Sequence, residues 1–477
     1  MFKMKKKPLR ILAIIFLLSL AFNLYLSFSS SYLNNDESYF NLRVINNIRS
    51  TGLPIFYDEL SYGGRALIVQ PLFYYLFTLF SFIPFYFKIF PALLISSLTL
   101  ISYLIAREIT NDENSSLFTA LLAGFIPIYS KVLINQFSVY NLVLPLIALI
   151  IFCFVKMEEK KYMVYFIIGS FLLALMHSSS FLLLFILLFY LLLMNTENLE
   201  ITKLKKEILI FTFFLVLFIN VLIFKRAFLA YGFNIIHGNN PIHYTFNVLQ
   251  GLYMIGIIPL FLGIIGLYQG FFKQKKESII LISSMILGVL FLLILNLINI
   301  NIGLLFLAFG LTITSSLAIK NFFIYFERTK FSSFRKLVPY GFILLFVLLS
   351  LIPTYFNYNK EFNDLSDFQW MRENSDEGDI ILTPLNYGHV VTYFSRKNVI
   401  DSNFLLAPDP EQRAYDVDLV YDGWSFNKAV ELLHEYGIKY IYISKEVKKI
   451  YNIEDLKYVK DEKCLAKVKE SIYKVVC

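Results

Sequence analysis

Long apolar runs, separated by short polar segments, recur through most of this sequence. Many of the runs hold about 17–20 apolar residues, the length that an α-helix needs to cross a bilayer. The chain is 57% hydrophobic and only 16% charged, whereas soluble proteins carry about 25% charged residues. These features predict a polytopic α-helical membrane protein with roughly eleven spans.

The charged residues between the runs predict how the chain is threaded. The first run, 9–28, follows a lysine-rich N-terminus and lacks a small-residue cleavage site, so we expect a retained first helix. The apolar segment 66–85 either spans or lies on the membrane surface. If it lies on the surface, the N-terminus and the lysine-rich loops are all cytoplasmic, as the positive-inside rule requires. The net charge of +8 then reflects topology and calls for no nucleic-acid partner.

A change of composition divides the chain in two. We expect a membrane domain at 1–356 and an extracytoplasmic α/β domain at 357–477, because charge rises and the apolar runs shorten there. The stretches DIILTP, NVIDS and IKYIYIS are typical of short buried strands, with a helix over 428–436. Cys464 and Cys477 either pair outside the cell or stay free thiols.

The loop at 31–65, directly after the first run, contains the first acidic pair of the chain, Asp36 and Glu37. On a helix, Asp36, Tyr39, Phe40 and Arg43 share one face. Aromatic rings suit sugars and a guanidinium suits phosphate. Gly63 and Gly64 would let a ligand approach the backbone. The same features also fit a solvated helix beside the membrane with an aromatic belt.

The sequence DESYFNLR after a first span resembles the GT-C glycosyltransferases, and in particular the catalytic subunit of oligosaccharyltransferases. The resemblance continues through LIAREIT, LFTALLAGFIP and the tail segment FQWMRENSDEGDIILTPLNYGHVVTYFSRKNVIDSNF. It implies sugar transfer from a polyprenyl (dolichyl) phosphate or pyrophosphate carrier to an extracytoplasmic glycan, lipid or protein.

Two departures from that family count against metal dependence and against peptide glycosylation. The family's Trp-Trp-Asp-Tyr-Gly motif aligns with 384–388, so both tryptophans and the acid are lost. The family's second acidic motif should fall in SKVLINQFSVYN, which has no carboxylate. What remains is similar to protein O-mannosyltransferases and aminoarabinose transferases. We therefore expect no required metal, although a weak Mg²⁺ or Mn²⁺ site is compatible with one or two carboxylates plus phosphate.

The resemblance also implies roles for individual residues. Asp36 is the candidate general base, with Glu37 as its substitute. The candidate donor-phosphate ligands are Arg65, Lys225, Arg226 and, in reserve, Arg43. The candidate substrate-binding residues are Tyr39, Phe40, His237, His243 and Tyr387, although a plain loop or turn role fits the last three as well.

Two other functions fit the same features. One is a transporter or flippase of lipid-linked glycans, but transporters place ionisable residues inside their spans, and the spans here are almost free of acids. The other is a non-catalytic relative that binds a lipid-linked sugar.

Overall fold

The computed structural model describes residues 6–232, 247–329, 338–356, 358, 362, 365–423, 425–458 and 464–477. The chain forms two compact units that are interleaved in sequence. The first unit contains Met1–Ser31, Phe82–Leu222 and Thr245–Asn359, and the second contains Tyr32–Ser81, Ile223–Tyr244 and Lys360–Cys477. The loop at 31–65 therefore belongs almost wholly with the C-terminal tail. The functional division at 356/357 stays a prediction.

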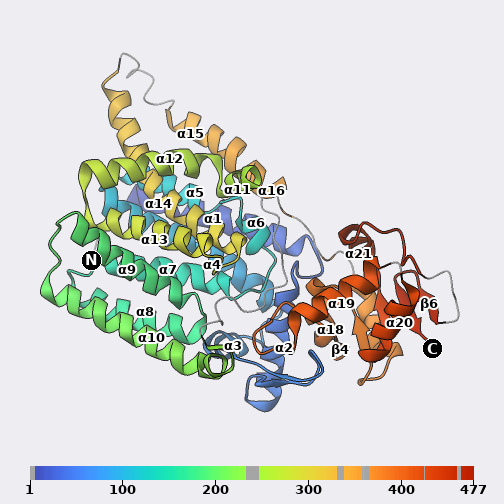
Figure 1. Cartoon of the computed structure of the whole chain (residues 1–477). Helices are drawn as coiled ribbons and strands as arrows, with labels where there is room; N and C mark the ends of the chain where they lie inside the picture. The colour runs from blue at the N-terminus through green and yellow to red at the C-terminus, as the bar shows by residue number, and fades with distance from the viewer. Residues whose placement is uncertain are drawn as a thin grey trace. The chain divides into compact units, whose positions relative to one another are not determined.

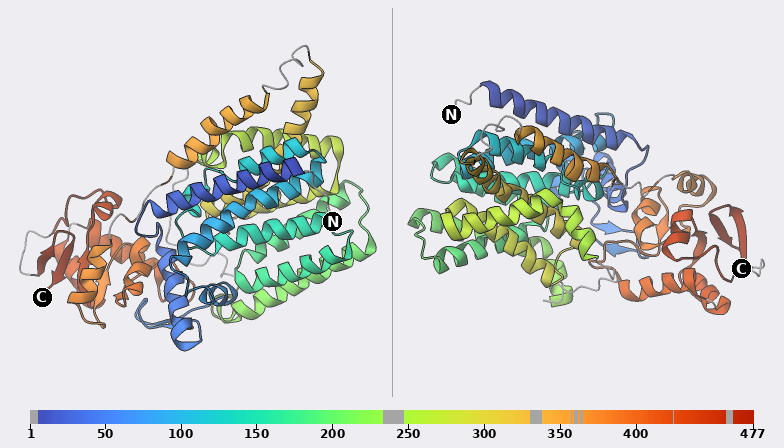
Figure 2. Two further views of the ribbon diagram at one scale, coloured as in Figure 1. Left: turned by 180° about the vertical axis from the view of Figure 1, so that it is seen from behind. Right: turned by 90° about the horizontal axis from the view of Figure 1, so that it is seen from above.

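The first unit consists of helices that run side by side as a bundle (Figure 1; Figure 2). Its elements are α1 (Lys6–Phe28), α4 (Tyr86–Thr110), α5 (Glu113–Ala123), α6 (Tyr129–Val132), α7 (Tyr140–Val155), α8 (Lys160–Met176), α9 (Ser180–Thr196), most of α10 (Lys203–Tyr231), α11 (Val248–Ile255), α12 (Ile257–Tyr268), η2 (Gln269–Gln274), α13 (Glu277–Ile294), α14 (Ile300–Glu327), α15 (Val338–Phe346), η4 (Val347–Leu351) and α16 (Ile352–Phe356).

Several of these helices can cross a membrane. Within the described residues, six are long and apolar enough, namely Lys7–Phe28, Tyr86–Thr110, Lys203–Tyr231, Ile257–Gln274, Glu277–Ile294 and Ile300–Glu327. Shorter apolar helices cover Tyr140–Val155, Ser180–Thr196 and Gly341–Phe356. The prediction of a polytopic α-helical membrane protein is confirmed, while the number of roughly eleven spans stays a prediction.

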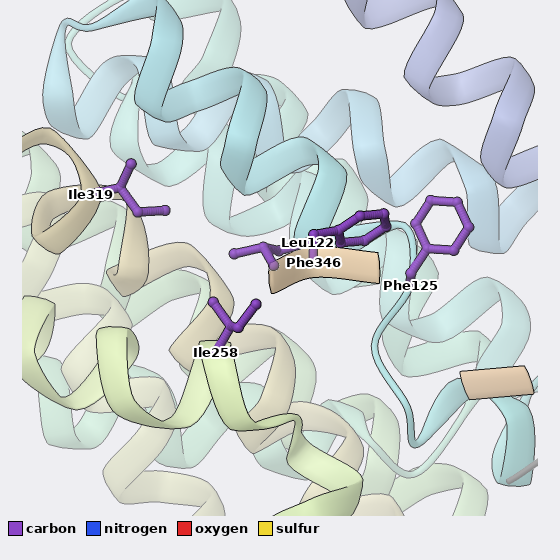
Figure 3. Packing of buried hydrophobic residues seen from close by; sticks show 5 residues of the cluster. All are labelled: Leu122, Phe125, Ile258, Ile319 and Phe346. Atoms are coloured by element: carbon purple, nitrogen blue, oxygen red, sulfur yellow. The ribbon is translucent and has the colours of Figure 1, made fainter. Parts of the chain in front are cut away.

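Helix α14 lies at the centre of the bundle, where it packs against α4, α5, α12 and α13. Glycines bring α12 close to it, because a Cβ at Gly266 would lie only 1.9 Å from the carbonyl oxygen of Thr314. Small residues at such contacts are the usual means of packing helices in lipid. Leu122, Phe125, Ile258, Ile319 and Phe346 form a buried apolar cluster between α5, α12, α14 and α15 (Figure 3).

The second unit combines helices with a five-stranded sheet. From the first loop it takes α2 (Asp36–Thr51), β1 (Tyr57–Asp58), β2 (Arg65–Ala66) and α3 (Leu72–Thr78). From the tail it takes α17 (Ser366–Asn374), β3 (Ile380–Leu382), η5 (Leu385–Tyr387), α18 (Gly388–Tyr393), β4 (Lys397–Asn398), α19 (Pro410–Asp422), α20 (Phe426–Glu435), β5 (Ile438–Tyr442), α21 (Lys445–Ile450), β6 (Leu465–Lys469) and β7 (Ile472–Val475).

The sheet of the second unit has the strand order β4-β3-β5-β7-β6. Strand β3 pairs in parallel with β4 and β5, whereas β7 pairs antiparallel with β5 and β6. The predicted strands DIILTP and IKYIYIS correspond to β3 and β5, and the predicted helix corresponds to α20. The predicted strand NVIDS overlaps β4 only at Asn398, because β4 covers Lys397–Asn398 and the chain leaves the sheet after it. Strands β6 and β7 were not predicted, and a disulfide between Cys464 and Cys477 joins their outer ends.

The ambiguous segment 66–85 contains the short helix α3. Its seven residues rise about 10 Å, roughly a third of the hydrocarbon thickness of a bilayer. A helix of this length cannot cross the membrane by itself, which favours the surface-lying alternative.

Candidate active site

Helix α2 starts at the carboxylate that the sequence singles out. Asn35 precedes the helix in an extended conformation, and its side chain accepts a hydrogen bond from the backbone N–H of Ser38. At the other end Gly52 adopts φ 80° and donates to the carbonyl of Ile48, a left-handed cap that suits glycine. Asp36 therefore occupies the first turn, where the helix dipole favours negative charge. The predicted helix carrying Asp36, Tyr39, Phe40 and Arg43 is confirmed.

The Asp36 carboxylate is held by backbone groups at the start of α18. It accepts hydrogen bonds from the backbone N–H of His389 at 3.1 Å and of Val390 at 2.8 Å. The residue is only 7% exposed. Burial raises the pKa of Asp36 to about 6, although His389 and the two backbone hydrogen bonds oppose that rise. A carboxylate with such a pKa can accept a proton near neutral pH.

Tyr39 and Phe40 pack inside the second unit. The hydroxyl of Tyr39 accepts a hydrogen bond from the backbone N–H of Leu33 at 3.1 Å, and its ring lies 5.3 Å from that of Tyr393. The ring of Phe40 lies 4.9 Å from the imidazole of His389. Both side chains are buried, so in this structure they fix α2 against α18 and do not offer an open ring face.

The two arginines of the first loop form ion pairs. Arg43 makes a two-pronged pair with Asp58, with nitrogen–oxygen distances of 2.8 and 2.5 Å. Arg65 donates to both carboxylate oxygens of Asp401 at 2.8 and 3.1 Å, and also to the carbonyl of Asn403. The side chains of Arg65 and Asp401 are 1% and 0% exposed. In this state, Arg65 therefore ties the loop to the tail and does not face solvent.

Asp401 and His389 are functional candidates that the sequence reasoning missed. The Nδ1 atom of His389 lies 3.7 Å from the Asp401 carboxylate, and His389 is 3% exposed. Burial works to raise the pKa of Asp401, but His389, Arg65 and the Ser61 hydroxyl outweigh it and hold that pKa below its ordinary value. Asp401 lies within the predicted strand segment NVIDS, and an acid inside an otherwise apolar predicted strand was the available signal.

The other predicted site residues lie in different surroundings. Glu37 is partly buried on α2, while Lys225 and Arg226 are exposed near the end of α10. Tyr387 is buried, with its ring 5.0 Å from Phe362 and 5.4 Å from Tyr442. His237 and His243 lie outside the described residues. The structure thus brings together Asp36, Tyr39 and Phe40, with His389 as a new neighbour.

The side chains that could hold a metal ion were expected in the loop 130–141. Within the described residues, no group of three or more His, Cys, Asp or Glu side chains is placed to hold one. In the loop where acids were sought, Gln136 donates to the carbonyl of Lys131, and the Asn141 side chain bonds to the backbone of Leu133 and Ser138. These amides are engaged within the loop.

Comparison with solved structures places this architecture. The apo oligosaccharyltransferase of Archaeoglobus fulgidus matches with a TM-score of 0.72 and 14% identity, over 95% of this chain and 72% of that chain. ArnT from Cupriavidus metallidurans, bound to undecaprenyl phosphate, matches with a TM-score of 0.55 and 10% identity, over 98% and 97%. The chain has the fold of the GT-C membrane glycosyltransferases.

Sequence comparison reaches a smaller part of the chain. No family model matches. The "Dolichyl-phosphooligosaccharide-protein glycotransferase 2" of Pyrococcus furiosus is 29% identical over 103 residues, which is 22% of this chain and 12% of that protein. The chain thus spans a small fraction of this curated relative. The A. fulgidus GT-C enzyme is also known in complex with an inhibitory peptide and a dolichol-phosphate.

Proposed function

We propose that this chain is a glycosyltransferase that transfers a sugar from a polyprenyl (dolichyl) phosphate-linked donor to an extracytoplasmic acceptor, which is a glycan, a lipid or a protein. The observation that carries the proposal is the buried Asp36 at the start of α2, with a pKa of about 6, in a GT-C fold. Proteins of this fold include an oligosaccharyltransferase solved with dolichol-phosphate and ArnT solved with undecaprenyl phosphate.

The reaction we propose is a single displacement at the anomeric carbon. Asp36 accepts the proton of the acceptor hydroxyl as its oxygen bonds to the sugar. The bond between the anomeric carbon and the donor phosphate oxygen breaks, and the phosphate leaves on its carrier. Negative charge on that phosphate requires fixed positive charge nearby.

We assign the phosphate contact first to Lys225 and Arg226, because both are exposed. Arg43 and Arg65 are proposed in second place, since each would first have to release its carboxylate partner. His237 and His243 remain proposed contacts of sugar or phosphate. We propose that Tyr39, Phe40 and Tyr387 affect substrate binding indirectly, because their packing holds the helices around the site in place.

The proposal includes a membrane orientation. We infer that the N-terminus is cytoplasmic and that the second unit, with Asp36, is extracytoplasmic. The lysine distribution supports this threading. The disulfide between Cys464 and Cys477 supports it as well, because such bonds persist in oxidising compartments.

Transfer of radiolabel tests the function directly. Purified protein is incubated with radiolabelled polyprenyl-phosphate sugars, and label is followed into protein, lipid and glycan fractions. We expect Asp36→Asn to lower transfer on the order of 10²–10⁴-fold, while donor binding persists. Glu37→Gln is the matched control on the same turn.

Each outcome of this assay separates the hypotheses. A dead Glu37→Gln with an active Asp36→Asn would move the base by one residue. An active double variant would refute the mechanism. Donor binding without transfer by the wild type, for every donor tried, would support a non-catalytic relative instead.

A further inference from the structure

An apolar groove lies on the first unit, and all the residues that line it belong to that unit. Its volume is about 680 Å³, and Asn114 is its one polar lining residue among those the structure describes. Three segments line it with one stripe of side chains each, and Phe323 on α14 also lines it. The stripes are Ile11, Ile15, Leu18 and Phe22 on α1, Leu117, Phe118, Leu121 and Phe125 on and just after α5, and Ile343, Phe346, Val347 and Leu351 on α15 and η4.

The groove opens to the outer surface of the helical bundle. Leu18 and Ile343 line it from opposite helices, yet they remain 57% and 45% exposed. In a membrane-spanning bundle, the medium at such a surface is lipid. An open apolar groove there will be filled by a hydrocarbon chain and not by water.

The groove has one polar end. Asn114, Phe323 and Pro339 line both the groove and a second cavity of about 250 Å³, which is also lined by Asn111, Asp112, Lys320, Ile324 and Glu327. This second cavity holds an ammonium and two carboxylates. The Lys320 ammonium donates a hydrogen bond of 2.7 Å to the carbonyl of Thr110, which uses one of its three donors.

Aromatic rings line the other end of the groove. Phe125 lies 5.3 Å from Phe22 and 5.2 Å from Phe346, and Figure 3 shows Phe125 and Phe346 beside each other above Ile258. From Ile11 to Phe22 the stripe on α1 rises about 16 Å. That length is close to half of a hydrocarbon core of about 30 Å, which is the depth of one leaflet.

We propose that the groove and the polar cavity together form a binding site for one membrane glycerophospholipid with a zwitterionic headgroup. Its chains fill the groove from Ile11 to Phe22, its phosphate contacts Lys320, and its amine lies near Asp112 and Glu327. The lipid belongs to the leaflet on the side of the N-terminus, because the polar cavity lies at the N-terminal end of the α1 stripe. None of the residues that line the groove or the polar cavity is among those proposed to contact the donor.

Matched tryptophan variants test the site on the full chain. Leu18→Trp and Ile343→Trp put a large ring into the groove. The controls are Leu17→Trp and Leu344→Trp, whose native side chains are 58% and 61% exposed and do not line it. Each protein is taken from nanodiscs of equimolar phosphatidylethanolamine and phosphatidylglycerol, and native mass spectrometry counts the lipids retained per chain.

We expect the wild type and both controls to retain one phosphatidylethanolamine, and the two groove variants to retain it about tenfold less. Equal retention in all five proteins would overturn the site. Equal retention of phosphatidylglycerol would overturn the headgroup assignment. Displacement of the lipid by added undecaprenyl phosphate, blocked by Leu18→Trp, would assign the groove to the donor chain and would also overturn the proposal.

Discussion

Asp36 is held by the backbone of α18 and not by a cationic side chain. Two N–H groups at the start of that helix fix both carboxylate oxygens, while burial makes the charged form costly. The first effect orients the side chain, and the second brings its pKa into the range where a general base works near neutral pH. The hydrogen bonds therefore orient the carboxylate, and burial raises its pKa against their opposing effect.

The raised pKa of Asp36 predicts an acid limb in the pH profile. Below a pH of about 6 the side chain is protonated and cannot accept the acceptor's proton, so kcat/KM should fall as the pH drops through that value. Transfer measured between about pH 4.5 and 8 checks this. Glu37→Gln should keep the limb in place. A rate that stays constant down to about pH 4.5 would contradict the role of Asp36.

The same pKa links Asp36 to stability with a definite sign. Because the folded-state pKa lies above the ordinary value of 3.8, folding favours the protonated form. The contribution to the free energy of unfolding is fully present below about pH 4 and is lost as the pH rises through about 6, a change on the order of 3 kcal/mol. At neutral pH the protein therefore lacks this stabilisation, and Asp36 is ionised and able to accept a proton.

The sequence predicted which residues of α2 lie beside Asp36, but it did not predict the remote residues that contact Asp36 and Arg65. The spacing of Asp36, Tyr39 and Phe40 predicted a shared helix face, which the structure has. Nothing local could reveal that His389, 353 residues away, supplies the N–H that holds Asp36. Likewise, the sequence predicted a phosphate contact for Arg65. Its ion pair with the buried Asp401 could not be predicted, because Asp401 is remote in sequence.

Helix α18 and the turn before it need Gly388 for steric reasons. A Cβ at this position would lie 2.2 Å from the carbonyl oxygen of Ile400 and 2.5 Å from the Cβ of Asp401. No side-chain rotation relieves a contact with a backbone oxygen. The close approach sets α18 beside Asp401 and so helps to position His389.

Gly388→Ala should therefore destabilise the protein by about 1–3 kcal/mol or more. Gly378→Ala is the matched control, because nothing lies within 4 Å of a Cβ there, and its effect should stay within about 0.5 kcal/mol. Thermal unfolding of the full chain in detergent, followed by near-ultraviolet circular dichroism, measures the difference. Equal melting temperatures for the two variants would show that the turn can relax.

The loop between α6 and α7 predicts how the activity responds to chelators. The side-chain amides of Gln136 and Asn141 bond to the loop's own backbone, and neutral oxygens do not offset the dehydration of a divalent ion. We expect transfer to survive EDTA. Complete loss on chelation, restored by Mn²⁺ or Mg²⁺, would show that a metal bound with substrate phosphate is required and that the oligosaccharyltransferase-like mechanism applies.

For the elements of the tail, sequence reasoning succeeded where burial was continuous. Strands β3 and β5 lie inside the sheet, so their sequences are apolar, and this apolar pattern predicted them as strands. Strands β6 and β7 have exposed or partly exposed residues at 466–469 and 474, so their pattern resembles a polar tail. Their pairing depends on contacts across a hairpin, which enrichment in β-branched and aromatic residues does not reveal.

For the whole molecule, the sequence predicted the membrane bundle but not the interleaving of its units. Apolar length is a local property, so the spans could be predicted from windows of residues. The association of Tyr32–Ser81 with Lys360–Cys477 depends on long-range contacts such as the buried Arg65–Asp401 pair. Composition alone divides a chain in sequence order, and here the compact units do not follow that order.

The interleaving makes membrane topology decisive for function, because the Asp36 loop and the tail share one compact unit and must lie on the same side. We predict that protease added to sealed right-side-out vesicles digests 357–477 and leaves an N-terminal tag intact. Vesicles opened with detergent provide the control, in which the tag is lost as well. Non-reducing electrophoresis of thiol-labelled samples should also show Cys464 and Cys477 unreactive, as the disulfide requires. A tail that is protected in sealed vesicles would place Asp36 in the cytoplasm, and the proposed transfer to an extracytoplasmic acceptor would then be wrong.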